Sequence, residues 1–419
     1  MRPRAIDLFA GVGGFSLGLE QAGFDVVAAV EKDPVHAITH QYNFPSAATL
    51  CRDLSKVEPE DILQACALDV GELDLLAGGP PCQGFSTMGH RETTDARNSL
   101  VFEFLRMVEG LRPHYFVMEN VEGLVQGEMG SFVGHLLESF KDAGYSVRFP
   151  IQVLNASAFG VPQSRKRVFL VGSRRGFRQP EYPKATGAPA PTVEDAIGDL
   201  PPIEDYVRLF STDMLEPRYG VGSAYALCLR GEAIDPNDFS IPRKRPKLVT
   251  GFRRARHTPE TRARFRATKQ GTVEPVSRFM RLAWDGLAPT LRAGSGSDRG
   301  SFSAPRPIHP EKSRCICVRE AARLHGFPDW FGFHTTIWHG FRQVGNSVPP
   351  PLARAVGSEV LQAIGLTPSR VTIEQELGTA EWLRLPVSQA RERLAKPVGS
   401  KRGTVIPAPA SSEKVQIPA

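Results

Sequence analysis

The feature that most constrains the fold is a series of short apolar segments alternating with amphipathic ones over the first 175 residues. Five β-branched runs are typical of buried strands: AIDLFAG, DVVAAVE, LDLLAGG, HYFVMEN and RVFLVGS. Each is followed by Gly, Pro or polar residues and then by helical spacing, as in FSLGLEQAG or SLVFEFLRMVEGL. This βαβ series predicts an α/β fold: a doubly wound, mostly parallel sheet with helices on both faces and a ligand crevice at the carboxyl ends of the strands.

The regularity is lost over residues 174–310, where Pro-, Gly- and Arg-rich segments predict a smaller second domain of loops and short strands. Within it, residues 241–270 carry eleven Lys or Arg and one acid, although the whole chain has a net charge of only +6. A charge run of this kind is either a solvated face or a nucleic-acid surface, and charge alone leaves both open. Helical periodicity returns at 318–327 and 343–365. The Pro- and Ser-rich end of the tail beyond these segments is expected to be disordered.

Several protein classes are disfavoured by the composition. No stretch approaches the roughly 20 apolar residues of a membrane span, and the N-terminus lacks the apolar run of a signal peptide, so we expect an intracellular protein. The six cysteines lie far apart except for Cys315 and Cys317, which matches neither a disulfide framework nor a four-ligand zinc site. No metal is therefore predicted, and any cysteine that matters would act as a single thiol.

A glycine-rich turn follows the first predicted strand. In DLFAGVGGF, Gly11, Gly13 and Gly14 stand where glycines let a ligand approach the backbone and a helix N-terminus. The dinucleotide spacing G-x-G-x-x-G is absent, which disfavours a nicotinamide cofactor. Glu31 ends the second strand, where a carboxylate can accept hydrogen bonds from ribose hydroxyls, and Asp53 follows later in the chain. Acids that recur at successive strand ends favour a ligand site over isolated helix caps.

A second group of reactive side chains follows the later strands. Cys82 stands just after a strand in GGPPCQGFS, where the flanking Pro, Gln and Gly are poor core formers and a nearby helix start would favour the thiolate. Glu119 ends the next strand, and Arg165 and Arg167 stand at the head of another. We therefore interpret Cys82 as a nucleophile that converges with a carboxyl and guanidinium groups.

The motifs DLFAGVGGF, E-x-D at Glu31–Asp33, GGPPCQGFS, ENV, QSRKR and GNSVPPPLA, in this order, resemble those of the cytosine-5 DNA methyltransferase family in its bacterial form. They cover the chain from about residue 4 to 358, apart from a variable stretch from 174 to about 279. The resemblance implies methyl transfer from S-adenosylmethionine to C5 of cytosine within a short specific sequence of duplex DNA.

The resemblance also implies a division of the chain. Residues 1–185 together with 340–365 would form the catalytic S-adenosylmethionine-dependent methyltransferase domain, which has a Rossmann-like fold. Residues 186–339 would form the smaller target-recognition domain and the junction, and 366–419 a C-terminal tail that is partly disordered.

The implied chemistry starts from the weak nucleophilicity of cytosine C5, which requires a thiolate to add first to C6. By resemblance Cys82 forms this adduct, Glu119 donates a hydrogen bond at ring N3 and contacts the exocyclic amine, and Arg167 holds O2. Arg165 is grouped with these catalytic residues as a supporting contact. C5 then attacks the sulfonium methyl, and loss of the C5 proton, to a base that the sequence leaves open, allows elimination of Cys82. The target base must be flipped out of the duplex.

The implied cofactor site is carried over position by position. Phe9 would stack on adenine, Glu31 would bind the ribose, and Asp53 would accept from the adenine amine. Lys32 departs from the family pattern, because relatives often carry an apolar residue there; its alkyl stem would have to substitute. The complete predicted set is Phe9, Gly11, Gly13, Glu31, Asp53, Pro80, Leu100 and Asn346.

Two segments are implied to contact DNA. The loop after Cys82, with Gln83, Ser86 and Arg97, would close over the flipped base. The basic segment lies in the variable region where the family keeps its recognition domain, and we assign Arg253, Arg254 and Arg264 to DNA. Most of these arginines should contact phosphates and few should read base edges.

Two alternatives stay beside this interpretation: a tRNA cytosine-5 methyltransferase of the same fold and an inert DNA-binding partner. The arginine cluster and PPCQGFS favour DNA over tRNA, and the intact Cys82, Glu119 and Arg167 argue against an inert module. The resemblance implies a bacterial cytoplasmic, nucleoid-associated enzyme, monomeric on DNA. A cognate restriction endonuclease encoded nearby is an open question at this point.

Overall fold

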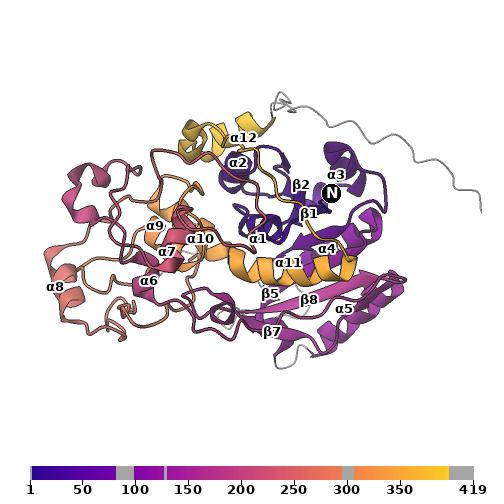
Figure 1. Ribbon diagram of the computed structural model, residues 1–419, viewed down its shortest axis with the longest axis horizontal. Helices are drawn as coiled ribbons and strands as arrows, with labels where there is room; N and C mark the ends of the chain where they lie inside the picture. Colours follow the sequence, from indigo (N-terminus) through magenta and orange to yellow (C-terminus); the bar gives the residue numbers. More distant parts are fainter. Residues whose placement is uncertain (1, 82–98, 127–129, 295–305, 396–419) are drawn as a thin grey trace, which may run out of the picture.

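The computed structural model describes residues 2–81, 99–126, 130–294 and 306–395 (Figure 1). Its centre is an eight-stranded sheet with the order β3-β2-β1-β4-β5-β8-β6, in which β7 also pairs with β8. The strands are β1 (Arg4–Leu8), β2 (Asp25–Val30), β3 (Ala48–Leu50), β4 (Leu75–Gly78), β5 (Tyr115–Val121), β6 (Tyr145–Val147), β7 (Gln152–Asn155) and β8 (Lys166–Arg174). The α/β class and the mostly parallel sheet predicted from the sequence are confirmed.

The sheet changes direction at one edge. β1 to β5 pair in parallel, whereas β8 runs antiparallel to β5, and β6 and β7 run antiparallel to β8. The run RVFLVGS is therefore a strand as predicted, but not a parallel one. An apolar run predicts burial on both faces, and it carries no information about the direction of the strand.

Helices cover both faces of the sheet and bury two apolar cores. On β1, Ile6 belongs to one core with Phe104 of α4, and Ala5 belongs to the other with Phe15 of α1 and Leu352 of α11, because successive strand residues point to opposite faces. The flanking helices are α1 (Gly14–Ala22), α2 (Pro34–Asn43), α3 (Pro59–Cys66), α4 (Ser99–Leu111), α5 (Gly130–Asp142) and α11 (Pro350–Ile364). The predicted helical segment SLVFEFLRMVEGL coincides with α4.

Two helices far apart in the sequence lie side by side on one face, α1 and α11 (Figure 1). A Cβ added to Gly18 of α1 would stand 2.4 Å from the Cβ of Ala353 and 2.5 Å from the carbonyl oxygen of Pro350. Only glycine permits this approach of the two backbones. The helix that follows the glycine-rich turn is thus held in place by α11, which begins within the GNSVPPPLA motif.

The remaining part of the chain, residues 186–346, is held mainly by helices and loops (Figure 1, left). Its helices are α6 (Val193–Ile197), α7 (Ala224–Arg230), α8 (Pro259–Ala267), α9 (Val318–Leu324) and α10 (Ile337–Asn346). Among its described residues, β pairing is confined to isolated bridges. Among the described residues of the whole chain, short 3-10 turns lie at Leu54–Lys56, Glu122–Val125, Ala156–Phe159, Ile203–Asp205, Val207–Phe210 and Ala380–Arg384. One core joins Val12 and Leu17 of the sheet part to Leu324 and Phe327, so the two parts pack as neighbours.

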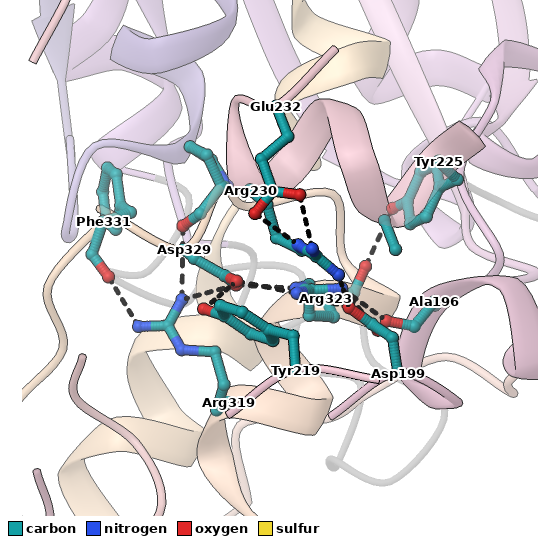
Figure 2. Close-up of polar contacts among 12 residues, drawn as sticks. Ala196, Asp199, Tyr219, Tyr225, Arg230, Glu232, Arg319, Arg323, Asp329 and Phe331 are labelled. Atoms are coloured by element: carbon teal, nitrogen blue, oxygen red, sulfur yellow. Dashed lines mark hydrogen bonds and ion pairs between the residues drawn. The ribbon is translucent and has the colours of Figure 1, made fainter. Parts of the chain in front are cut away.

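Buried arginines organise this second part around α9 (Figure 2). Arg323 is fully buried and donates to Asp329 at 2.6 and 2.7 Å and to Asp199 at 3.1 Å. Arg319, also fully buried, donates to the carbonyl oxygen of Phe331 at 2.8 Å, and the Tyr219 hydroxyl donates to Asp329. These guanidinium groups supply hydrogen-bond donors to buried carboxylates and to loop carbonyl oxygens, which have no partner on a neighbouring strand.

The segment after α11 is described through residue 395 and is anchored to the rest of the protein at a few points. α12 (Val387–Ala395) lies on α2, and Leu383 and Ala390 are fully buried. Gln375 pairs with the basic segment, since its backbone NH donates to the Pro242 carbonyl oxygen at 2.8 Å. The predicted disordered end lies outside the described residues. Among the described helices, none is long and apolar enough to cross a membrane.

Candidate functional site

A carboxylate and a guanidinium group stand together where β5 meets β8. Val121 is the register partner of Arg167, so Glu119, two residues earlier on β5, is a diagonal neighbour on the same face. Arg167 Nε lies 2.8 Å from Glu119 Oε1, and the side chains are only 14% and 12% exposed. The structure therefore brings together these two predicted site residues. The two side chains, which keep a small exposed fraction, offer a hydrogen-bond donor and an acceptor side by side. This arrangement suits a flat ring that has both a carbonyl and an amine.

The segment leading from β4 is fixed against this pair. The side-chain amide of Asn120 donates to the Pro80 carbonyl oxygen at 3.2 Å. A Cβ added to Gly79 would stand 3.1 Å from Glu119 Oε2, so the backbone passes close to the carboxylate. The chain therefore approaches Cys82 from directly beside Glu119. Cys82 itself, with the predicted DNA contacts Gln83, Ser86 and Arg97, lies outside the described residues.

The hydrogen bonds of Arg165 lead away from the pair, so its predicted role as a supporting contact stays a prediction. It is 2% exposed and donates to three carbonyl oxygens: Leu291 at 2.9 Å, Gly345 at 2.9 Å and Ser347 at 3.1 Å. Arg165 precedes β8, so the strand alternation that aims Arg167 does not apply to it. It ties the site to the end of α10, which makes it a positioning residue.

The glycine-rich turn has the shape of a ligand cradle anchored by Glu31. Glu31 Oε2 accepts from the backbone NH of Gly11 at 2.8 Å, and Oε1 accepts from that of Asp33 at 2.7 Å. Phe9 and Gly11 are both in the left-handed region, with φ of 58°. A Cβ added to Gly11 would meet nothing within 4 Å, so the space beside it is open. This open, backbone-lined turn beside a carboxylate fits a nucleoside ligand such as S-adenosylmethionine.

At the far end of this cradle, Lys32 is engaged with Asp53. Lys32 Nζ lies 2.7 Å from Asp53 Oδ2, while Asp53 Oδ1 accepts from the hydroxyl of Ser55 at 3.0 Å. The hydrogen bond from Lys32 is the main cause that lowers the pKa of Asp53. The ammonium of Lys32 is therefore directed at the carboxylate proposed for adenine, a contact that the motif alone did not predict.

The other predicted cofactor residues lie at the ends of elements around the same edge. Pro80 is buried beyond β4, and Leu100 is half-buried in the first turn of α4. Asn346 is the last residue of α10 and is exposed. Gly13 caps α1 with φ of 99°, and a Cβ there would overlap the ring of Phe44 at 2.3 Å.

Several arginines of the basic segment are bound within the protein. Arg254 donates to the Glu204 carbonyl oxygen and stacks on Phe210 at 4.2 Å. Arg264 Nε lies 3.3 Å from the carboxylate of Glu274, whose side chain is 1% exposed. These two contacts compete with the DNA role that the sequence predicts for Arg254 and Arg264. The exposed cations of the segment are Lys244, Arg245, Lys247, Arg256, Arg262, Arg266 and Lys269.

Comparisons with known proteins point in one direction. The family model described as C-5 cytosine-specific DNA methylase matches residues 3–362. The chain is 48% identical to the Type II methyltransferase M.XorII of Xanthomonas oryzae over 93% of this chain and 92% of that protein. It is 33% identical to M.DdeI of Desulfomicrobium norvegicum over 85% and 88% of the two chains. A crystal structure titled as a putative DNA modification methyltransferase from an E. coli prophage matches with a TM-score of 0.72 and 32% identity, covering 87% of this chain and all of that one.

Proposed function

Because the chain belongs to the C-5 cytosine-specific DNA methylase family, we propose that it methylates C5 of cytosine in a short specific sequence of duplex DNA. The observation that carries the site assignment is the pairing of Glu119 with Arg167 beside the backbone that leads to Cys82. S-adenosylmethionine supplies the electrophilic methyl group when it is bound.

The flipped cytosine enters between Cys82 and the Glu119–Arg167 pair. Arg167 donates to O2, and Glu119 donates a hydrogen bond at N3, so both stabilise the charge that enters the ring as the Cys82 thiolate adds to C6. Because the two side chains already contact each other, each holds the other in place before the base arrives. Cys82 leaves again once the C5 proton has been lost.

The cofactor is held along the carboxyl edge of the parallel strands. Glu31 fixes the turn at Gly11 and keeps lone pairs for the ribose hydroxyls, and Asp53 faces the adenine amine. Phe9, Gly13, Pro80, Leu100 and Asn346 complete the proposed site, all of them at strand or helix ends around this edge.

The part formed by residues 186–339 recognises DNA in this proposal. Its exposed cations Arg256, Arg262 and Arg266 supply phosphate contacts. Arg253, which the sequence assigns to DNA together with Arg254 and Arg264, is half-buried. The Type II names of the relatives support a restriction-modification setting, with a cognate endonuclease encoded nearby and a location in the bacterial cytoplasm on the nucleoid.

The test is methyl transfer by the purified protein from labelled S-adenosylmethionine to plasmid DNA and, separately, to bulk tRNA. We expect label in the plasmid only, and bisulfite sequencing should place every modified cytosine in one short sequence. Cys82→Ser should give no label, whereas the matched variant Cys228→Ser, at an exposed cysteine outside the motifs, should behave as the parent. Label in tRNA alone, or modified cytosines scattered without a common sequence, would contradict the proposal.

A further inference from the structure

A short extended segment, residues 288–293, runs beside the chain that enters β8. Ala288 forms a parallel bridge with Gln163, and the Thr290 hydroxyl donates to the carbonyl oxygen of Ser164 at 2.8 Å. Thr290 and Ser164 are 126 residues apart in the sequence. Tertiary contacts therefore fix this segment along the QSRKR motif.

The register of the two chains carries Arg292 to the edge of the site. Counted from the bridge, Arg292 and Arg167 are each the fourth residue along, and the two chains run in the same direction. The carbonyl oxygen of Leu291 accepts from Arg165 at 2.9 Å, which fixes the backbone one residue before Arg292. The backbone of Arg292 is thus held beside the chain that carries Arg167, the partner of Glu119.

The backbone after Arg292 is held by the end of α10. A Cβ added to Gly345 would stand 2.6 Å from the carbonyl carbon of Arg292 and 2.4 Å from the backbone nitrogen of Ala293. Arg165 also donates to the Gly345 carbonyl oxygen at 2.9 Å. The next residue, Asn346, is proposed to bind the cofactor. Arg292 therefore stands between the chain of the catalytic pair and the chain of the cofactor site.

The side chain of Arg292 faces away from the core. Leu291 is 3% exposed and belongs to the core that joins the two parts of the chain, whereas Arg292 is exposed. Glu119 is held by Arg167, and no carboxylate of the described residues pairs with Arg292. An exposed guanidinium group on a backbone fixed from both sides is suited to bind an anion that arrives with the substrate.

A flipped cytosine brings such an anion. When a nucleotide rotates out of the duplex, the phosphates on either side of it move with the backbone, so they take up this position only in the flipped state. We propose that Arg292 binds a phosphate that flanks the flipped cytosine, through two of its guanidinium nitrogens, and thereby stabilises the flipped state. This inference rests on the proposed function, because it requires the chain to flip a cytosine into the site.

The consequence separates Arg292 from the exposed arginines of the basic segment. A contact to a phosphate of unflipped DNA, as proposed for Arg262 and Arg266, stabilises the complex with any duplex. A contact made only to the flipped nucleotide stabilises the complex with the cognate duplex alone. Loss of Arg292 should therefore lower the methylation rate without lowering affinity for unrelated DNA.

The first test is single-turnover methylation of a short duplex that contains the sequence found by bisulfite mapping. At limiting DNA, Arg292→Gln should lower the rate by about 10- to 100-fold, as expected for one charged contact. Affinity for S-adenosylmethionine and for a scrambled duplex should stay at the parent values. Arg292→Lys keeps the charge but not the contact through two nitrogens, so it should recover part of the rate. Arg178→Gln, at an exposed arginine beyond the far end of β8, is the matched control and should behave as the parent.

The second test removes the charge from the DNA instead. A single methylphosphonate at the phosphate 5′ or 3′ of the target cytosine, at whichever of the two Arg292 contacts, should slow the parent protein by a similar factor. On that duplex Arg292→Gln should lose nothing further, because the contact is already absent. A duplex with 2-aminopurine at the target position reports flipping through its fluorescence. The rise in fluorescence on binding should be smaller with Arg292→Gln than with the parent.

Three outcomes would overturn the inference while methylation by the parent protein upheld the proposed function. They are an unchanged rate in Arg292→Gln, an equal loss of affinity for the scrambled duplex, and an undiminished loss on both flanking methylphosphonate duplexes. A parent protein that methylates no DNA would contradict the proposed function itself.

Discussion

The sheet part and the part proposed to recognise DNA, residues 186–339 and called the recognition part below, are stabilised in different ways. In the sheet part, strand ladders satisfy the backbone, and an apolar core lies on each face of the sheet. In the described residues of the recognition part, β pairing is limited to isolated bridges. Buried guanidinium groups donate to the loop carbonyl oxygens instead. Arg281 alone donates to carbonyl oxygens of five residues, which are Phe265, Arg266, Thr268, Pro310 and Glu311. Arginine content in this part thus serves structure as well as charge.

This difference teaches how specificity and chemistry can be separated. Regular strands set the Glu119–Arg167 pair by register, so its geometry depends on few side chains. Each irregular loop is held by a few long-range contacts of individual side chains. A loop can therefore be exchanged together with the side chain that holds it. Under the proposed function, the chemistry would belong to the sheet part and DNA recognition to the part that is held by individual loop contacts.

The sharpest test of this separation is Cys82→Ser in the sheet part. We expect no detectable turnover, because a hydroxyl does not replace the thiolate in attack on C6. Melting temperature and S-adenosylmethionine affinity, measured by scanning calorimetry and titration, should stay at the parent values. Substantial residual methylation would remove Cys82 as the nucleophile.

The next largest effect is expected from the pair itself. Arg167→Ala and Glu119→Gln should each slow single-turnover methyl transfer by about 10²- to 10⁴-fold, with little change in cofactor affinity. Because the two side chains contact each other and act on one base, the double variant should lose less than the sum of the two free-energy costs. Additive losses would mean that the pair does not act as a unit.

The recognition part should instead be sensitive to loss of a buried arginine. Arg323→Met removes the cation that bridges Asp199 and Asp329 and leaves Asp199 with Arg230 and Asp329 with Arg319 at 3.8 Å. Because each carboxylate keeps one arginine, the loss should be near the lower end of the cost of a broken buried ion pair, about 3 kcal/mol of stability. Urea unfolding followed by circular dichroism measures this cost. Arg262→Met, at an exposed arginine of the same part, should stay within about 0.5 kcal/mol of the parent. Similar stabilities for the two variants would mean that buried arginines do not stabilise the recognition part.

The smallest effect distinguishes exposed arginines from anchored ones. Replacing Arg262 and Arg266 by Gln should lower the slope of log affinity against log salt by about 0.9 for each phosphate that is no longer neutralised. Arg264→Gln should leave that slope unchanged, since Arg264 is paired with buried Glu274. Binding to cognate and scrambled duplexes across a salt series gives both values. If the slope of log affinity against log salt is unchanged when Arg262 and Arg266 are replaced, these arginines form a solvated face and do not contact phosphates.

The sequence predicted the strand ends well because buried parallel strands leave long apolar runs, as at LDLLAGG. It missed β3, β6 and β7, which have three or four residues each and are only partly buried. The convergence of Glu119 with Arg167 was predicted, but the register that causes it depends on the antiparallel β8. The contacts of Arg165 were not predictable, because its three carbonyl partners lie far from it in the sequence and are brought to it by tertiary packing, not by a local pattern.

The packing of α1 on α11 also determines when α1 can be covered during translation. The helix behind the cofactor turn is complete in sequence at residue 22, yet its packing partner ends at residue 364. At the usual bacterial rates of about 5–20 residues per second, the ribosome needs roughly 20 to 70 s to supply that partner. During this interval the apolar face of α1 lacks its cover. Nascent chains should therefore acquire cofactor binding only near the end of translation, and chaperones that hold exposed apolar segments would have their main opportunity before then.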